Sequence, residues 1–390
     1  MNNPRPHNRS LSLDANTFSV KNAPKLAQPI REESVSADSP GHPLEQVATE
    51  VAEAGENSSG EGTTLVSGQK LPASITDLTL APAESGAVAT RPAQYGWQGV
   101  INRLTFGVLK IGPSKDELMR RRAIETIQSS LSRPMTILVA NAAGGAGKTI
   151  TSIGMAGTFG IHRGGDVVVW DNNETQGSLA LRTNAQGSTR TVVDLLAAAD
   201  APGDMSLGEL APFLRRQGSS RFEVLASSTD PTEMKQIGRD EFNTVHSLLS
   251  RFKQLMIVDS GNNCLADNFV AAAESADLLI IPTSLQRDGA QRALWTLRTL
   301  YEAGYENLAN NAIIVITEGS KLKESAKTAQ EIRDTFAKKL DVIDIPYDPH
   351  LDRGSEIDLE LLHDKTRRAY ENLAALVMVR LRVLNPKDHH

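Results

Sequence analysis

Apolar and polar positions follow two alternating patterns from about residue 135 to residue 385. Continuous Val/Ile/Leu runs without alternation indicate strands buried on both faces. These runs are 135–142, 166–173, 222–228, 254–263, 277–284, 311–319 and 341–348. Apolar residues recur at helical spacing in 148–164, 191–200, 239–252, 289–304, 325–340 and 365–384. The alternation predicts an α/β fold, a doubly wound and mostly parallel sheet with helices on both faces, in a domain covering residues 134–386.

A helical lead-in is predicted before this domain, over residues 94–133. Its first apolar positions recur at spacings of three, four and one, as on one face of a short helix: Trp97, Val100, Ile101, Leu104, Val108 and Leu109. A second helix begins after Ser114 and carries three consecutive arginines, Arg120 to Arg122. Two interpretations remain open. Either both helices pack on the following domain, or they attach to a partner protein or a membrane surface.

Residues 1–93 differ from the rest in composition, being rich in Ser, Ala, Pro, Gly, Glu and Thr. Phe18 is the only aromatic residue before Tyr95. Such a segment buries too little apolar surface to offset its chain entropy. We therefore expect a disordered N-terminal tail, which serves either as a passive spacer or as an arm that binds a partner protein.

Overall composition limits the classes of function. The net charge of −6 gives no general case for nucleic-acid binding, so any such surface must be a local patch. The single cysteine, Cys264, excludes an internal disulfide and a cysteine-built zinc site, and it fits a reducing cytoplasm. No apolar run approaches the roughly 20 residues that a membrane-spanning helix needs.

Residues 142–149, AAGGAGKT, form a glycine-rich turn between a buried strand and a helix. In that context Gly144, Gly145 and Gly147 let backbone amides approach phosphate oxygens, and the positive end of the helix points at the same charge. Lys148 is expected to neutralise the β- and γ-phosphates, and Thr149 to bind magnesium. The turn therefore predicts a nucleotide site.

Two carboxylates follow other predicted strands and complete the pattern. Asp259 ends the strand LMIVD and is expected to join Thr149 in the magnesium shell. Asp171 follows four apolar residues in VVVWD. Because the carboxyl ends of parallel strands meet at one edge of a sheet, these groups are expected to lie near the glycine-rich turn.

The order of motifs GGAGKT, WDNNETQGSL, IVDSGNN and ADLLIIPTS resembles the ParA/MinD family of deviant phosphate-loop ATPases. The segments YGWQGVINRLTFGVLKIGPSKDE, LQRDGAQRAL and DPHLDRGSEIDLELL resemble an actinobacterial MinD-like branch associated with type VII secretion, conjugation or plasmid partition. The resemblance covers residues 95–380. It implies an ATP-dependent homodimer that positions or segregates a cargo, either DNA or an envelope-associated complex.

The resemblance also assigns roles to residues. ATP is expected to contact Gly144, Gly145, Ala146, Gly147, Lys148, Thr149, Ile150, Thr317, Pro346 and Asp348. The last three positions lie where the family reaches the adenine and ribose, although many relatives carry asparagine where this chain has Thr317. Mg²⁺ would be held by Thr149 and Asp259. The catalytic set would be Lys148, Asp171, Asn173 and Glu174.

Two departures from the family pattern affect hydrolysis. Ala143 stands where relatives have a signature lysine that reaches the partner's phosphates, and Asn173 stands where they have the aspartate that orients water. Asparagine hydrogen-bonds water but does not accept its proton. We expect ATP binding with slow turnover, with Glu174 as a substitute for the missing carboxylate. The alternative is a nucleotide-bound adaptor of a secretion or conjugation system that does not hydrolyse ATP.

The last predicted helix combines basic residues with an apolar stripe. Its basic residues are Lys365, Arg367, Arg368, Arg380 and Arg382, and its stripe is Leu373, Leu376, Val377, Leu381 and Leu384. This pattern fits a solvated helix face, contacts with the phosphates of non-specific DNA, or peripheral contact with a membrane. The protein is accordingly expected in the cytoplasm, on the nucleoid or at the membrane surface.

Overall fold

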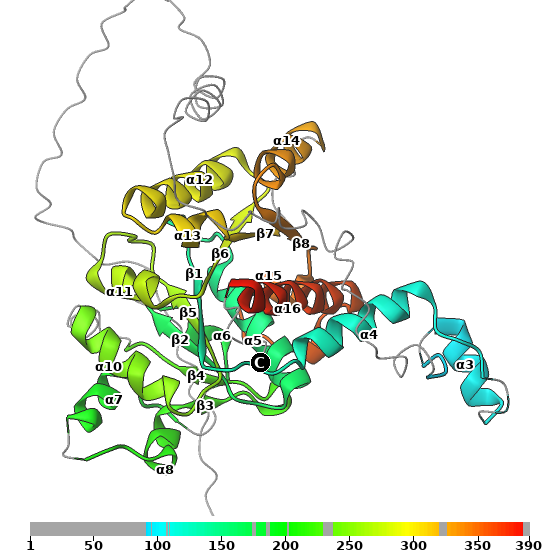
Figure 1. Ribbon diagram of the computed structural model, residues 1–390, viewed down its shortest axis with the longest axis horizontal. Helices are drawn as coiled ribbons and strands as arrows, with labels where there is room; N and C mark the ends of the chain where they lie inside the picture. The colour runs from blue at the N-terminus through cyan, green and yellow to red at the C-terminus, as the bar shows by residue number, and fades with distance from the viewer. Residues whose placement is uncertain are drawn as a thin grey trace, which may run out of the picture. The chain divides into compact units, whose positions relative to one another are not determined.

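The structure is a computed structural model (Figure 1), and it describes residues 91–94, 96–106, 108, 110–173, 177–184, 188–200, 203–228, 237–319 and 326–384. The tail predicted over residues 1–93 lies outside these ranges except for its last three residues. Glu174 also lies outside them. Within the described ranges, no helix combines the length and the apolar composition that crossing a membrane requires.

In the part of the chain that the structure describes, eight strands form one sheet in the order β3-β4-β2-β5-β1-β6-β7-β8. The strands are β1 Met135–Val139, β2 Val167–Asn172, β3 Arg215–Arg216, β4 Glu223–Leu225, β5 Leu255–Ser260, β6 Leu278–Ser284, β7 Ile313–Thr317 and β8 Asp341–Ile345. Every pairing is parallel except that of β3 with β4. The predicted α/β class with a mostly parallel sheet is therefore confirmed.

Helices cover both faces of the sheet (Figure 1). The longer ones are α3 Gly96–Leu104, α4 Lys115–Ile127, α5 Lys148–Arg163, α7 Val192–Ala199, α10 Arg239–Ser250, α11 Asp267–Ser275, α12 Arg287–Glu302, α14 Ala326–Ala337 and α16 Asp364–Leu384. Shorter elements are α6 Leu179–Arg182, α8 Leu207–Leu210, η1 Ala211–Phe213, η2 Gly218–Ser220, α13 Glu306–Asn310, α15 Pro349–Asp352 and η3 Leu359–Leu361.

Successive side chains of the central strand β1 enter two separate hydrophobic cores. Leu138 packs with the helices α7, α10, α11 and α12 on one face. Its neighbours Ile137 and Val139 pack with α5 and α16 on the other. This alternation is what a strand buried on both faces produces, because consecutive side chains point to opposite sides.

The apolar stripe predicted on the last helix lies in the second core. Leu373, Val377 and Leu381 are fully buried there, against α4, α5 and β8. Of the basic residues, Arg380 donates a hydrogen bond to Asp341 at 2.6 Å. The stripe is therefore a structural element of the core, and it is not a surface that lies on a membrane.

Helix α4 lies against α16 (Figure 1), and a largely buried ion pair joins the two helices. Arg120 donates two hydrogen bonds of 2.8 Å to the carboxylate of Glu371, and His162 of α5 lies 3.4 Å from the same group. Burial alone would raise the pKa of Glu371, but the hydrogen bonds from His162 and Arg120 lower it to about 2. The second lead-in helix thus packs on the domain.

Replacing Glu371 with glutamine is expected to lower the free energy of unfolding at neutral pH by about 2 kcal/mol, because one charged partner of a largely buried pair remains. A carboxylate whose pKa falls from 4.5 to about 2 stabilises the fold above pH 4.5. That stabilisation is lost as the pH falls through 2. Chemical denaturation across pH 2–7 should show the difference between wild type and Glu371→Gln shrinking toward acid.

Glu302→Gln is the matched control for this prediction. Glu302 pairs with Arg298 on the exposed face of α12, where an ion pair contributes little. Its effect should be small at every pH. A Glu371→Gln effect that does not change with pH would contradict the assignment of the stabilisation to the ionised carboxylate.

Close packing between α5 and α16 depends on Gly154. A β-carbon at this position would lie 2.2 Å from the ring of Tyr370, which is fully buried. We expect Gly154→Ala to lower the free energy of unfolding by about 3 kcal/mol through overpacking. The control is Gly208→Ala, where the nearest described neighbour of a β-carbon would be Ser206 Oγ at 3.9 Å and no loss is expected. Equal effects in denaturant titrations would contradict this packing argument.

Candidate nucleotide-binding site

The glycine-rich turn links β1 to α5 and needs glycine at its last position. Gly147 has φ 92°, in the left-handed region, and it caps the N-terminus of α5. A β-carbon there would also lie 3.0 Å from the hydroxyl of Thr317. Gly145 likewise has positive φ, 71°. Both positions therefore require glycine for the backbone to make this turn.

The N-terminus of α5 opens toward the turn without a competing charge. Its first turn has no acidic residue, and no side chain caps it. The unpaired amides and the helix dipole are therefore oriented to receive an anion. This is the part of the site that would receive phosphate.

Lys148 lies folded back over the turn. Its Nζ donates to the carbonyl oxygens of Asn141 at 2.9 Å and Ala143 at 3.1 Å, and to Oδ1 of Asn262 at 2.5 Å. Ala143 is itself buried, and its amide donates to Oδ1 of Asn141 at 2.8 Å. These contacts place the ammonium group inside the glycine-rich turn.

Thr149 and Asp259 lie together, as predicted for the magnesium pair. The hydroxyl of Thr149 donates to Oδ2 of Asp259 at 2.7 Å. Ser178 Oγ lies 2.7 Å from the same hydroxyl, and Ser152 donates to the other oxygen of Asp259 at 3.3 Å. The carboxylate is thus held in place from two sides by hydroxyl groups.

The two predicted acidic residues are direct neighbours across the sheet. Asp171 of β2 pairs in register with Asp259 of β5. Burial raises the pKa of Asp171 to about 7, and the nearby Asp259 adds to the shift. Burial likewise raises the pKa of Asp259 to about 6, against the opposing hydrogen bond from Thr149. Two buried carboxyl groups side by side form a site that favours a cation.

These groups surround a cavity of about 340 Å³. The cavity is lined by Gly144, Gly145, Ala146, Gly147, Lys148, Thr149, Ile150, Asp171, Asn173, Ser178, Arg182, Asp259, Ser260 and Asn262. Ten of these are residues singled out from the sequence. The remaining four, Ser178, Arg182, Ser260 and Asn262, were not predicted. Ser178, Ser260 and Asn262 lie in the motifs WDNNETQGSL and IVDSGNN that contain Asp171 and Asp259, which was the available signal. Arg182 lies three residues past the first of these motifs.

The residues that the family resemblance assigns to adenine and ribose lie outside the lining of this cavity. Thr317 lies behind Gly147, and neither it nor Pro346 nor Asp348 is among the cavity-lining residues. Asp348 is buried and accepts hydrogen bonds from the amides of His350 at 3.0 Å and His363 at 2.8 Å. In the described structure its carboxylate therefore holds the start of α15 and the loop before α16.

The donor set fits magnesium bound together with a nucleotide. No group of three or more His, Cys, Asp or Glu side chains gathers as a metal site among the described residues. Mg²⁺ is usually held by one or two protein oxygens, with waters and substrate phosphates completing its octahedron. Thr149 and Asp259, beside an anion-binding turn, supply that minimal set.

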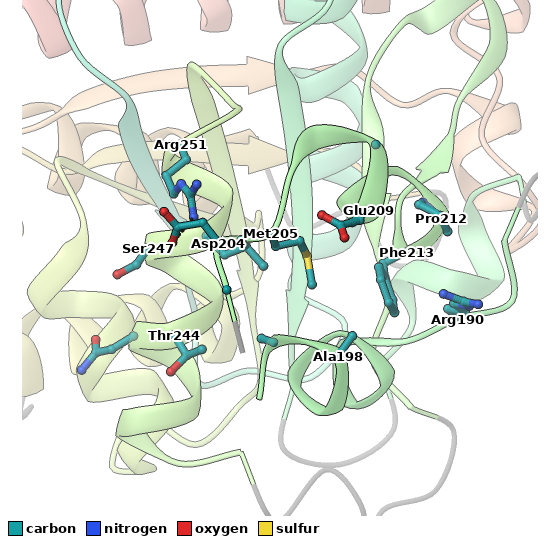
Figure 2. Close-up of a pocket in the computed structure, with 15 residues that line it drawn as sticks. Arg190, Ala198, Asp204, Met205, Glu209, Pro212, Phe213, Thr244, Ser247 and Arg251 are labelled. Carbon is teal, nitrogen blue, oxygen red and sulfur yellow. Dashed lines mark hydrogen bonds and ion pairs between the residues drawn. The ribbon is translucent and has the colours of Figure 1, made fainter. Parts of the chain in front are cut away.

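A second, larger cavity of about 920 Å³ lies beside α7 and α10 (Figure 2). Its charged side chains interact within the wall. Arg251 lies 3.4 Å from Asp204, and the Arg190 guanidinium stacks 4.9 Å from the ring centre of Phe213. Glu209 accepts from the amide of Ser206 at 2.8 Å. The smaller cavity, and not this one, contains the glycine-rich turn.

Comparison with known proteins identifies the class of this domain. Residues 137–359, more than half of the chain, match the CobQ/CobB/MinD/ParA nucleotide binding domain. The chain belongs to this family. The match includes the turn, both buried aspartates and the strands that carry them.

Individual relatives are more distant. The chain is 25% identical over 286 residues to the ESX-1 secretion-associated protein EspI of Mycobacterium tuberculosis, which covers 73% of this chain and 42% of EspI. The chain thus spans less than half the length of that relative. A ParA family ATPase from Chlorobium tepidum superposes with a TM-score of 0.50 at 17% identity, covering 62% of this chain and 98% of that structure. MinD of Pyrococcus horikoshii, complexed with Mg-ADP, gives 0.48 at 20% identity, covering 63% of this chain and 96% of that structure.

Proposed function

We propose that the protein binds Mg-ATP in the 340 Å³ cavity and that the bound nucleotide controls formation of a homodimer. The dimer would position or segregate a cargo, either plasmid or chromosomal DNA or an envelope-associated complex. The observation that carries the proposal is the arrangement of Lys148, Thr149 and Asp259 around the turn at the N-terminus of α5. Membership in a nucleotide-binding family supports it.

Each residue has a defined task in this proposal. Lys148 would exchange its carbonyl partners Asn141 and Ala143 for the β- and γ-phosphates. The turn amides would hold the remaining phosphate oxygens. Thr149 and Asp259 would hold Mg²⁺, which supplies charge neutralisation at the phosphates when bound. Asp171, beside Asp259, would hydrogen-bond water in the magnesium shell.

Arg182 adds a second cation to the cavity wall. Its Nη2 donates to the carbonyl of Leu351 at 2.6 Å, and its buried Nε has no hydrogen-bond partner among the described residues. Lys148 and Arg182 are the two cations among the cavity-lining residues named above. A triphosphate carries several negative charges, so we infer that Arg182 also faces the nucleotide.

We infer that hydrolysis is slow. Ala143 provides no ammonium group, and Asn173, which lines the cavity, provides no carboxylate to orient the attacking water. The same two residues favour the alternative function, a nucleotide-bound adaptor that scaffolds a secretion or conjugation complex without hydrolysis. Similarity to a protein named ESX-1 secretion-associated supports a secretion complex as the partner in this alternative.

The proposed dimerisation is tested by the mass of the full chain in solution. Sedimentation velocity with Mg²⁺ should give a dimer with ATP or a non-hydrolysable analogue, and a monomer with ADP or without nucleotide. Asp259→Asn should remain monomeric with ATP, because the magnesium pair is lost. A mass that is the same under all these conditions would overturn nucleotide-controlled dimerisation. Nucleotide binding itself is tested separately, by measuring the affinity for Mg-ATP.

A further inference from the structure

Helix α3 and the turn after it carry a cluster of exposed apolar side chains. Trp97, Val100 and Leu104 are 66, 57 and 73% exposed. They recur at positions i, i+3 and i+7, so they share one face of the helix. Phe106 and Val108 extend the cluster, with 96% and 84% exposure. We call these five side chains the α3 face. Two aromatic rings are exposed to water here, Trp97 on the helix and Phe106 in the turn after it, and a binding surface would explain this exposure.

The backbone at Phe106 adds to this cost. Its φ of 50° lies in the left-handed region, just past the end of α3, where glycine is the usual residue. A bulky residue in this conformation is strained. The ring is held almost fully in solvent on that strained backbone. The position therefore costs stability in the isolated chain and gains nothing there through burial.

The α3 face is nevertheless held in a fixed geometry. Asn102, a buried residue of α3 itself, donates to the carbonyls of Ala93 at 3.0 Å and Ile111 at 2.9 Å, and accepts from the Ile111 amide at 2.8 Å. These bonds join the segments before and after the helix. Glu117 then accepts from the Gln94 amide at 2.8 Å, which ties the unit to α4. Exposure of the apolar face is thus a property of an ordered element.

Charge around the α3 face identifies its partner. The chain has a net charge of −6, yet residues 91–115 contain four basic residues and no acidic one. Arg91, Arg103, Lys110 and Lys115 are all exposed. A short helix with Trp97 on its exposed apolar side, followed by Phe106 in the next turn and accompanied by four exposed basic residues, matches the interface of an anionic bilayer. There the rings enter the headgroup region, and the basic groups contact lipid phosphates.

We propose that the α3 face is a membrane-docking surface that places the nucleotide-binding domain on an anionic lipid bilayer. Helix α3 lies at the start of the described chain, directly before α4, and α4 packs against α16. It does not use the last helix, whose apolar stripe is buried. It is independent of nucleotide, because none of its residues lines the 340 Å³ cavity.

Flotation of the full chain with lipid vesicles, in the absence of nucleotide, tests this proposal. Vesicles of phosphatidylcholine with phosphatidylglycerol should bind the protein at least about tenfold more strongly than phosphatidylcholine alone, and added salt should weaken the binding. Trp97→Ser/Leu104→Ser/Phe106→Ser should lose at least about tenfold of that binding. Arg103→Gln/Lys110→Gln should reduce the preference for the anionic lipid.

The matched control replaces exposed apolar residues elsewhere. Leu294→Ser/Trp295→Ser/Tyr301→Ser, on α12, removes three exposed side chains that include two aromatic rings and should leave vesicle binding unchanged. Failure of the wild type to float, or equal flotation of the α3 triple variant, would overturn the proposal. A nucleotide-free dimer that the α3 triple variant dissociates would assign the face to a second copy and overturn it as well.

Discussion

Lys148→Ala is expected to weaken the binding of Mg-ATP at least about 100-fold. In the proposed complex its ammonium group makes two charge-assisted hydrogen bonds to phosphate, each contributing about 1.5–3 kcal/mol. Losing both corresponds to two or more factors of ten in affinity. The dissociation constant would be measured by competition with a fluorescent ATP analogue in the presence of Mg²⁺.

The fold should survive this change, because the Lys148 side chain is only half-buried and lines the cavity. Far-UV circular dichroism should be unaltered. The control is Lys327→Ala, which removes an exposed lysine from α14 and should not change the affinity. An affinity equal to that of wild type in a folded Lys148→Ala protein would show that the nucleotide binds elsewhere.

The double change Ala143→Lys/Asn173→Asp is expected to raise steady-state ATP turnover at least about tenfold, equivalent to about 1.4 kcal/mol off the barrier. Catalysis of phosphoryl transfer depends on positioning and on stabilisation of charge. The first change supplies a cation beside the turn and the second a carboxylate within the cavity. Turnover would be measured at saturating Mg-ATP for wild type, each single change and the double, with DNA and with anionic vesicles in separate series.

Ala143 is buried, so a folding defect must be separated from a catalytic result. Thermal unfolding and nucleotide affinity of each variant supply that separation. Asn262→Asp is the matched control, since it adds a carboxylate at another cavity-lining position and should not raise turnover. A wild type that already turns over rapidly, with no gain in the folded double variant, would assign the water-orienting role to another group. Glu174 is the first candidate for that role.

Most of the sheet could be predicted from sequence because its strands are buried on both faces. The runs ILV in β1 and LLIIP in β6 contain no polar residue. Such uninterrupted apolar runs are typical of strands that helices cover on both faces. The two-residue strand β3 was not predicted, since Arg215 and Arg216 carry no apolar pattern. Helix α11, between β5 and β6, was not predicted either.

The site was predictable where residues are adjacent in sequence and less so where tertiary packing decides. Gly147, Lys148 and Thr149 are consecutive at the start of α5, and Asp259 lies near the carboxyl end of β5, which pairs with β1, so the parallel sheet brings these residues together. Arg182 comes from a four-residue helix whose place no periodicity indicates. The role of Asp348 depends on two backbone amides, those of His350 and His363. His363 lies fifteen residues after Asp348, and local sequence patterns do not predict a contact over that separation.

The exposed α3 face illustrates the same limit. Its helical period is plain in the sequence, but period alone does not tell whether an apolar face is covered. The last helix has a similar stripe and buries it. Only the tertiary arrangement separates a core helix from one that presents Trp97 and Phe106 to solvent.

The central claim is that this chain holds one Mg-nucleotide in the cavity at the N-terminus of α5. Isothermal titration calorimetry of the full wild-type chain with ATP, in the presence of Mg²⁺ and again with the metal chelated, tests it most directly. The account predicts saturable binding of one ATP per chain that weakens at least about tenfold without the metal. Absence of binding with Mg²⁺, or a binding curve that chelation leaves unchanged, would contradict it.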